Sequence, residues 1–158
     1  MKIVQLLQSG KVLLNIDESW LNESDFRRSK WRESDGTNVV PIHTMLPRIT
    51  VIVALDTLGN VYITLSQANS NNKTMEIYFH HLVGKLDRER PDWREDTVLL
   101  LDGASYHKSS STLSVFKSLR IPVMILGPHS YDIAVCELFF SFLKSSEMNP
   151  MFQPTGKK

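Results

Sequence analysis

Residues 97–107 read TVLLLDGASYH, and this stretch decides which fold the chain can adopt. Its apolar run, Val98 to Leu101, has no polar alternation, which is typical of a strand that is buried on both faces in a parallel sheet. Asp102 ends the run. A carboxylate in this position is costly unless something pairs with it. The stretch therefore predicts a central strand with a partnered carboxylate at its end.

Two further acidic residues lie in comparable settings. Asp17 ends the apolar run in VLLNIDESWLN, and Glu137 lies early in the helical pattern AVCELFFSFLK. Three carboxylates from distant parts of a chain suggest a shared cation. Oxygen ligands of this kind suit Mg²⁺ or Mn²⁺ and not zinc. Divalent ions held by carboxylates are widely used to cut and join phosphodiesters.

The remaining pattern predicts an α/β domain. Strands are expected at 12–16, 49–55, 61–65, 98–102 and 123–126, and helices at 1–9, 73–88, 110–120 and 134–145. The Gly-Asn turn between the second and third strands predicts antiparallel pairing. Three helices show apolar residues at helical spacing, which predicts their core faces: Met75, Tyr78, Phe79, Leu82 and Leu86; Leu113, Phe116 and Leu119; Val135, Leu138, Phe139 and Phe142. Helices should cover both faces of one mixed sheet.

Composition fits one folded domain inside a cell. The chain has 158 residues, 42% of them hydrophobic, and a net charge of +1, which argues neither for nor against nucleic acid. Cys136 is the single cysteine, so no intrachain disulfide is possible, which fits a reducing compartment. No membrane span or signal peptide is evident. We expect a domain over residues 1–146, an irregular or hairpin segment over 23–47, and a flexible tail over 147–158.

Three segments, NIDESWLN, LLLDGASYHKS and LGPHSYDIAVCELFFSFLK, together resemble the DDE transposase superfamily, in particular its mariner-type group. The 34 residues between Asp102 and Glu137 match the spacing of that group. The resemblance covers roughly residues 1–155. It implies a ribonuclease H-like fold, a five-stranded mixed sheet flanked by helices. In that fold the first two acids lie on neighbouring strands and the third comes from a later helix.

The resemblance also implies a mechanism. Asp17, Asp102 and Glu137 would be the catalytic and metal-binding residues for DNA cleavage and strand transfer with Mg²⁺ or Mn²⁺. Asp17 would bridge two ions, and the other two acids would each support one. The implied partners are transposon ends, target DNA and a second copy of the chain. The implied location is the nucleus in a eukaryote and the cytoplasm in a bacterium.

Each acid also has a simpler interpretation. Asp17 and Asp102 could be turn residues, and Glu137 a first-turn acid favoured by the helix dipole. Asp132 competes with Glu137 as the third ligand. Glu18 alternates to the other side of its strand and is predicted to be solvated. His107 either approaches the metal site or DNA, or lies on the surface.

Candidate DNA contacts are basic or aromatic. Lys108 and Lys144 are close in sequence to the acids, and the segment RRSKWR contributes Arg27, Arg28, Lys30, Trp31 and Arg32. A solvated loop is an equal alternative for that segment.

Two other functions compete with a transposase. One is an inactive or domesticated derivative that keeps the fold as a DNA- or protein-binding module. The absence of an N-terminal helix-turn-helix pattern favours it, whereas the three intact acids favour an enzyme. The other is a nuclease that acts on RNA–DNA hybrids. The 34-residue interval and the HKS that follows the 98–102 strand argue against it.

Overall fold

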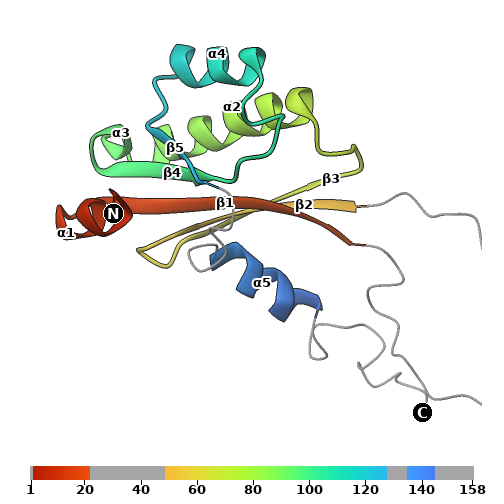
Figure 1. The fold of residues 1–158 in the computed structure, drawn as a ribbon, viewed down its shortest axis with the longest axis horizontal. Coiled ribbons are helices and arrows are strands. Elements are labelled where there is room, and N and C mark those ends of the chain that lie inside the picture. The colour runs from red at the N-terminus through yellow and green to blue at the C-terminus, as the bar shows by residue number, and fades with distance from the viewer. Residues whose placement is uncertain (1, 22–48, 128–134, 145–158) are drawn as a thin grey trace, which may run out of the picture.

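A five-stranded sheet in the order β3-β2-β1-β4-β5 runs through the centre of the protein (Figure 1). The computed structural model describes residues 2–21, 49–127 and 135–144. The strands are β1 (Val12–Leu21), β2 (Ile49–Asp56), β3 (Val61–Ser66), β4 (Thr97–Leu101) and β5 (Val123–Ile125). The helices are α1 (Lys2–Gln8), α2 (Asn72–Glu89), α3 (Trp93–Asp96), α4 (Ser110–Ser118) and α5 (Val135–Lys144). None of the helices in these ranges is long and apolar enough to cross a membrane.

The sheet is mixed, as the sequence predicted. β1 pairs antiparallel with β2 and parallel with β4, while β2 and β3 form an antiparallel hairpin and β4 and β5 run parallel. The hairpin turn needs Gly59, because its φ of +90° is strained for any residue with a side chain. β4 lies between two parallel neighbours. Four of its five residues are buried, as its unbroken apolar run predicted.

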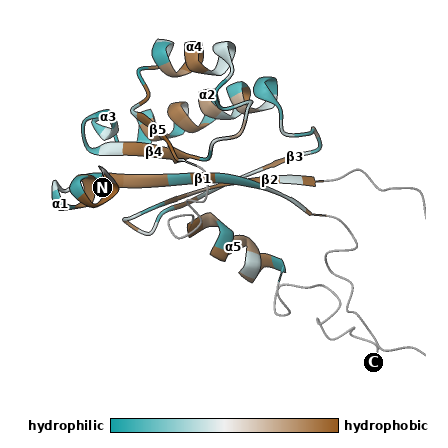
Figure 2. Cartoon of the chain, viewed as in Figure 1, coloured by the Kyte–Doolittle hydropathy of each residue, from teal (hydrophilic) through white to brown (hydrophobic). Residues whose placement is uncertain are grey.

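Helices cover both faces of the sheet. α2 and α4 lie on one side and α5 on the other (Figure 1). The predicted core face of α2 is confirmed, since all five of its residues are buried: Met75, Tyr78, Phe79, Leu82 and Leu86. They pack with Leu14, Ile16, Leu99 and Leu101 of the central strands. Each such side chain contributes about 1.5–3 kcal/mol on full burial. Figure 2 shows this hydrophobic colouring along the start of β1 and along β4.

Two predicted helix faces need correction. In α4, Phe116 is buried and Leu119 half-buried, but Leu113 is 46% exposed. In α5 the predicted stripe is wrong, because Val135, Leu138 and Phe142 are 53%, 74% and 55% exposed. Of the predicted stripe only Phe139 packs toward Val51 and Val53 of β2, where it is joined by Cys136, Phe140 and Leu143. Apolar residues occupy most of the circumference of α5, so periodicity alone did not select its buried side.

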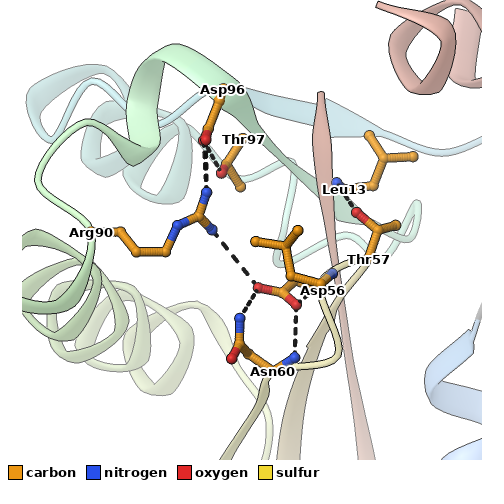
Figure 3. A network of polar contacts seen from close by, with 8 residues as sticks. Leu13, Asp56, Thr57, Asn60, Arg90, Asp96 and Thr97 are labelled. Atoms are coloured by element: carbon orange, nitrogen blue, oxygen red, sulfur yellow. Dashed lines mark hydrogen bonds and ion pairs between the residues drawn. The ribbon is translucent and has the colours of Figure 1, made fainter. Parts of the chain in front are cut away.

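A polar network fixes the end of the sheet where β1 and β4 begin (Figure 3). The Asp56 carboxylate accepts hydrogen bonds from the backbone N–H groups of Leu58 and Asn60 and from the Asn60 side chain. Arg90, which follows α2, lies 3.8 Å from Asp56 and donates to both oxygens of Asp96 at 2.8 and 2.9 Å. The network ties the β2–β3 turn to the end of α2 and the start of β4.

Candidate active site

Asp17 and Asp102 are brought together by the parallel pairing of β1 and β4. The ladder pairs Asn15 with Leu100, and continuing it by two residues sets Asp17 level with Asp102. Ile16 and Leu101 belong to the core beneath α2. Because side chains alternate along a strand, Asp17 belongs to the opposite face, which α5 covers, while Asp102 follows the last residue of β4. The sheet thus sets the two carboxylates level with one another, Asp17 in the middle of β1 and Asp102 directly after β4.

Glu137 reaches the same face because β1 holds the start of α5. The backbone N–H of Cys136 donates to the buried side-chain oxygen of Asn15 at 3.0 Å. The Cys136 thiol donates to the Asn15 carbonyl at 3.2 Å. Asn15 lies two residues before Asp17 on the same strand face, and Cys136 directly precedes Glu137. One buried contact therefore fixes the third acid relative to the first.

The three acids interact electrostatically. Burial raises the pKa of Asp17 from 3.8 to about 6. The negative charges of Glu18, Asp102 and Glu137 also raise this pKa, while the hydrogen bond that the Glu18 N–H donates to Asp17 Oδ1, at 2.8 Å, lowers it. Asp102 is more open, with a side chain that is 57% exposed. Its Oδ1 accepts a hydrogen bond of 3.0 Å from the N–H of Ala104.

Glu18 and His107 lie behind these acids and differ from their predicted settings. The prediction that Glu18 is solvated is wrong, because its side chain is only 4% exposed. Alternation does send Glu18 to the other face of β1, but there it meets the loop that follows β4. His107 in that loop is fully buried, so the surface alternative for it is also wrong. Its Nε2 lies 3.3 Å from Asp102 Oδ1 and 3.5 Å from Glu18 Oε1.

Two of the candidate DNA-contact residues lie near the acids. Lys108 is exposed, and its Nζ lies close to Gly103, the residue after Asp102. A Cβ atom built on Gly103 would stand 3.6 Å from this nitrogen. Lys144 in the last turn of α5 donates from Nζ to Ser19 Oγ at 2.8 Å. Both amines are therefore placed on segments that adjoin the carboxylates. The 23–47 segment with its RRSKWR cluster, the rival ligand Asp132 and the 147–158 tail lie outside the described residues.

A family model described as DDE superfamily endonuclease matches residues 12–154. The chain belongs to this superfamily. Comparison with curated protein sequences gives no match.

Solved structures similar to this DDE domain share its fold. A Mos1 transposase paired-end complex with left transposon end matches with a TM-score of 0.64 and 19% identity, over 90% of this chain and 45% of the Mos1 chain. The Mos1 transposase catalytic domain with raltegravir and Mg matches with a TM-score of 0.58 and 20% identity, over 82% and 58% of the two chains. A simian T-cell lymphotropic virus intasome in complex with a PP2A regulatory subunit matches with a TM-score of 0.58 and 14% identity, over 84% and 38%.

These matches support a ribonuclease H-like fold for the DDE domain, as predicted. The chain spans less than half the length of the Mos1 chain in the paired-end complex.

The donor atoms of this DDE domain fit a hard divalent cation. Asp17, Asp102 and Glu137 offer carboxylate oxygens, the ligand type that Mg²⁺ and Mn²⁺ take. Among the described residues, no group of three or more His, Cys, Asp or Glu side chains is close enough to enclose an ion. The three acids therefore form an open arrangement in this structure.

Proposed function

We propose that this chain is a catalytic core for metal-dependent DNA cleavage and strand transfer, of the transposase or integrase type. The observation that carries the proposal is the register of β1 and β4, which sets Asp17 beside Asp102 on the face where α5 presents Glu137. Neighbours solved with Mg or Mn, and with transposon ends, support the same chemistry for this chain.

In this proposal Asp17, Asp102 and Glu137 would together hold the divalent ions that the reaction uses. When bound, the ions supply the positive charge that activates water or a DNA 3′-hydroxyl and stabilises the leaving oxygen. Burial keeps the Asp17 carboxyl protonated to a higher pH than usual, with a pKa of about 6, so this residue would serve as a metal ligand chiefly above that pH. Lys108 and Lys144 contact DNA phosphates beside the acids.

The proposed partners are transposon ends, target DNA and a second copy of the chain. A second copy would supply the second set of carboxylates that acting on two DNA ends together requires. Lys108 and Lys144 alone offer few phosphate contacts, so we expect weak binding that falls steeply with salt.

A cleavage assay tests the proposal. Branched or nicked DNA is incubated with wild-type protein, Asp102→Asn and the matched control Asp92→Asn, in Mg²⁺ or in EDTA. Asp92 is exposed and precedes β4, at the end of the strand remote from Asp102. We expect cleavage by wild type and Asp92→Asn in Mg²⁺, and none by Asp102→Asn or in EDTA. Equal DNA binding by all variants without any cleavage would instead support the binding-module alternative.

A further inference from the structure

His107 is a buried polar side chain that lies against Asp102, one of the proposed metal ligands. Its ring is fully buried, and neither ring nitrogen makes a well-formed hydrogen bond within the described part of the chain. Nε2 nevertheless lies between two carboxylate oxygens, 3.3 Å from Asp102 Oδ1 and 3.5 Å from Glu18 Oε1. A polar group is seldom buried without a partner, because its lost hydration is not repaid. The position of Nε2 indicates that these carboxylates become its hydrogen-bond partners after small movements of the side chains.

The surroundings of His107 hold its ring in place. Tyr106 and Phe79 stack edge-on against it, with ring centroids 4.6 and 6.5 Å away. The loop is anchored to the start of α4, where the Thr112 hydroxyl donates to the Tyr106 carbonyl at 2.8 Å. Ser109 caps α4 by accepting from the Thr112 N–H at 3.2 Å. The imidazole is thus supported from α2 and α4, and its position does not depend on the proposed metal.

The buried carboxylate of Glu18 explains why an imidazole is placed here. Its carboxylate is 4% exposed, its Oε1 has no hydrogen-bond partner among the described residues, and a hydrogen bond links it to Tyr106. A buried carboxylate oxygen that lacks a donor is costly, because its lost hydration is not repaid. On the other side of the ring, Asp102 is 57% exposed, and the Ala104 N–H is the other donor to its Oδ1. His107 therefore connects an exposed carboxylate to a buried one.

We propose that His107, held by Glu18, is a positioning residue that fixes the orientation of Asp102 for metal binding. Asp102 Oδ1 faces the imidazole and the Ala104 N–H, which leaves Oδ2 for the cation. The arrangement resembles the outer-shell hydrogen bonds that orient metal ligands and whose loss typically lowers metal affinity about 10–100-fold. The inference rests on the proposed function, because it assumes that Asp102 is a metal ligand.

Metal affinity tests this inference without any cleavage assay. Free Mn²⁺ is measured by electron paramagnetic resonance during titration of wild type, His107→Asn, Glu18→Gln and His81→Asn. His81 is exposed on α2 and serves as the matched control. We expect His107→Asn to weaken Mn²⁺ binding about 10–100-fold and Glu18→Gln to weaken it less. His81→Asn should bind like wild type. Because Glu18 acts through His107, the double variant should bind no more weakly than His107→Asn alone.

The outcomes separate the two proposals. Wild-type affinity in both His107→Asn and Glu18→Gln would overturn the positioning role while leaving the metal site intact. No Mn²⁺ binding by wild type would overturn the metal site itself. Melting temperatures in EDTA check folding, and Glu18→Gln retains an acceptor oxygen and nearly the same volume. If His107→Asn does not fold, wild-type affinity in Glu18→Gln still contradicts the inference, and weakened affinity in that folded variant supports it.

Discussion

Asp17 sets the energetics of the site at the scale of single residues. Its pKa is raised to about 6 by burial and by the charges of Glu18, Asp102 and Glu137. In the unfolded chain the pKa returns to about 3.8, so the folded state holds the proton more tightly. As pH rises from about 4 through 6, ionisation therefore costs the folded state stability that the unfolded state does not lose. A bound cation would remove this penalty.

Asp17→Asn should accordingly stabilise the metal-free protein at pH 7.5. The asparagine keeps an oxygen for the Glu18 N–H and removes the charge. Allowing for partial solvent screening, we expect a gain of about 1–2 kcal/mol at pH 7.5, fading to about zero at pH 4. Urea unfolding in EDTA at the two pH values measures the difference. A loss of stability of equal size at both pH values would show that the carboxylate is not under electrostatic strain.

Asp56 shows that the same local pattern has another use. It ends the strand ITVIVALD, and in the sequence it follows an apolar run much as Asp17 and Asp102 do, although β1 continues past Asp17 to Leu21. Because β2 runs antiparallel to β1, Asp56 lies at the opposite end of the sheet, where its 1% exposed carboxylate closes a turn (Figure 3). Strand direction, and not the residues next to the aspartate, separates a turn residue from a candidate metal ligand.

Replacing Asp56 should affect folding and not metal. Asp56→Ala leaves the N–H groups of Leu58 and Asn60 without their acceptor, so we expect a loss of about 1–3 kcal/mol. Chemical unfolding gives the loss, and a Mn²⁺ titration of the folded variant should match wild type. A large drop in metal affinity would mean that the two ends of the sheet are coupled.

At the scale of elements, α5 connects the core to the third acid. Its N-terminus is held by Asn15, and its buried face packs on β2 through Cys136 and Phe140. The buried position of Cys136, together with the nearby charge of Asp17, raises its pKa to about 12. The thiol is therefore unreactive while α5 is docked, which makes it a probe for that docking.

Asn15→Ala should loosen α5. The Cys136 N–H then loses its acceptor inside the protein, which should cost about 1–3 kcal/mol. Labelling by a disulfide reagent should be very slow in wild type and clearly faster in Asn15→Ala under the same native conditions. Equal labelling rates would indicate that packing alone holds the helix.

A second prediction for α5 compares its two apolar faces. Phe140→Ala removes a 7% exposed ring and should cost about 3–5 kcal/mol, whereas Leu138→Ala removes a 74% exposed side chain and should cost about 0.5 kcal/mol or less. Urea denaturation of both variants provides the comparison. A larger loss for Leu138→Ala would favour the face that the periodicity of the sequence predicted.

At the scale of the whole molecule, the sequence was sufficient for the architecture. Unbroken apolar runs are characteristic of buried strands, and the Gly-Asn turn predicted the hairpin. With the helical spacing of apolar residues between the strands, these signals predicted a mixed sheet with helices on both faces. Packing across elements was not predictable in the same way. The alternation that sent Glu18 away from Asp17 was correct, but the loop containing His107 covers that face and buries Glu18. Likewise, the rotation of α5 depends on Asn15, 121 residues away from Cys136.

Calorimetric titration with Mn²⁺ tests the central claim most directly, because it detects metal binding without DNA. It compares wild type with Asp17→Asn, Asp102→Asn, Glu137→Gln and the exposed control Asp92→Asn. We predict saturable binding of about two ions by wild type and Asp92→Asn, and loss of that binding in each of the other three variants. Binding that is equal in all five proteins, or absent from wild type, would contradict the assignment of these carboxylates to a metal site.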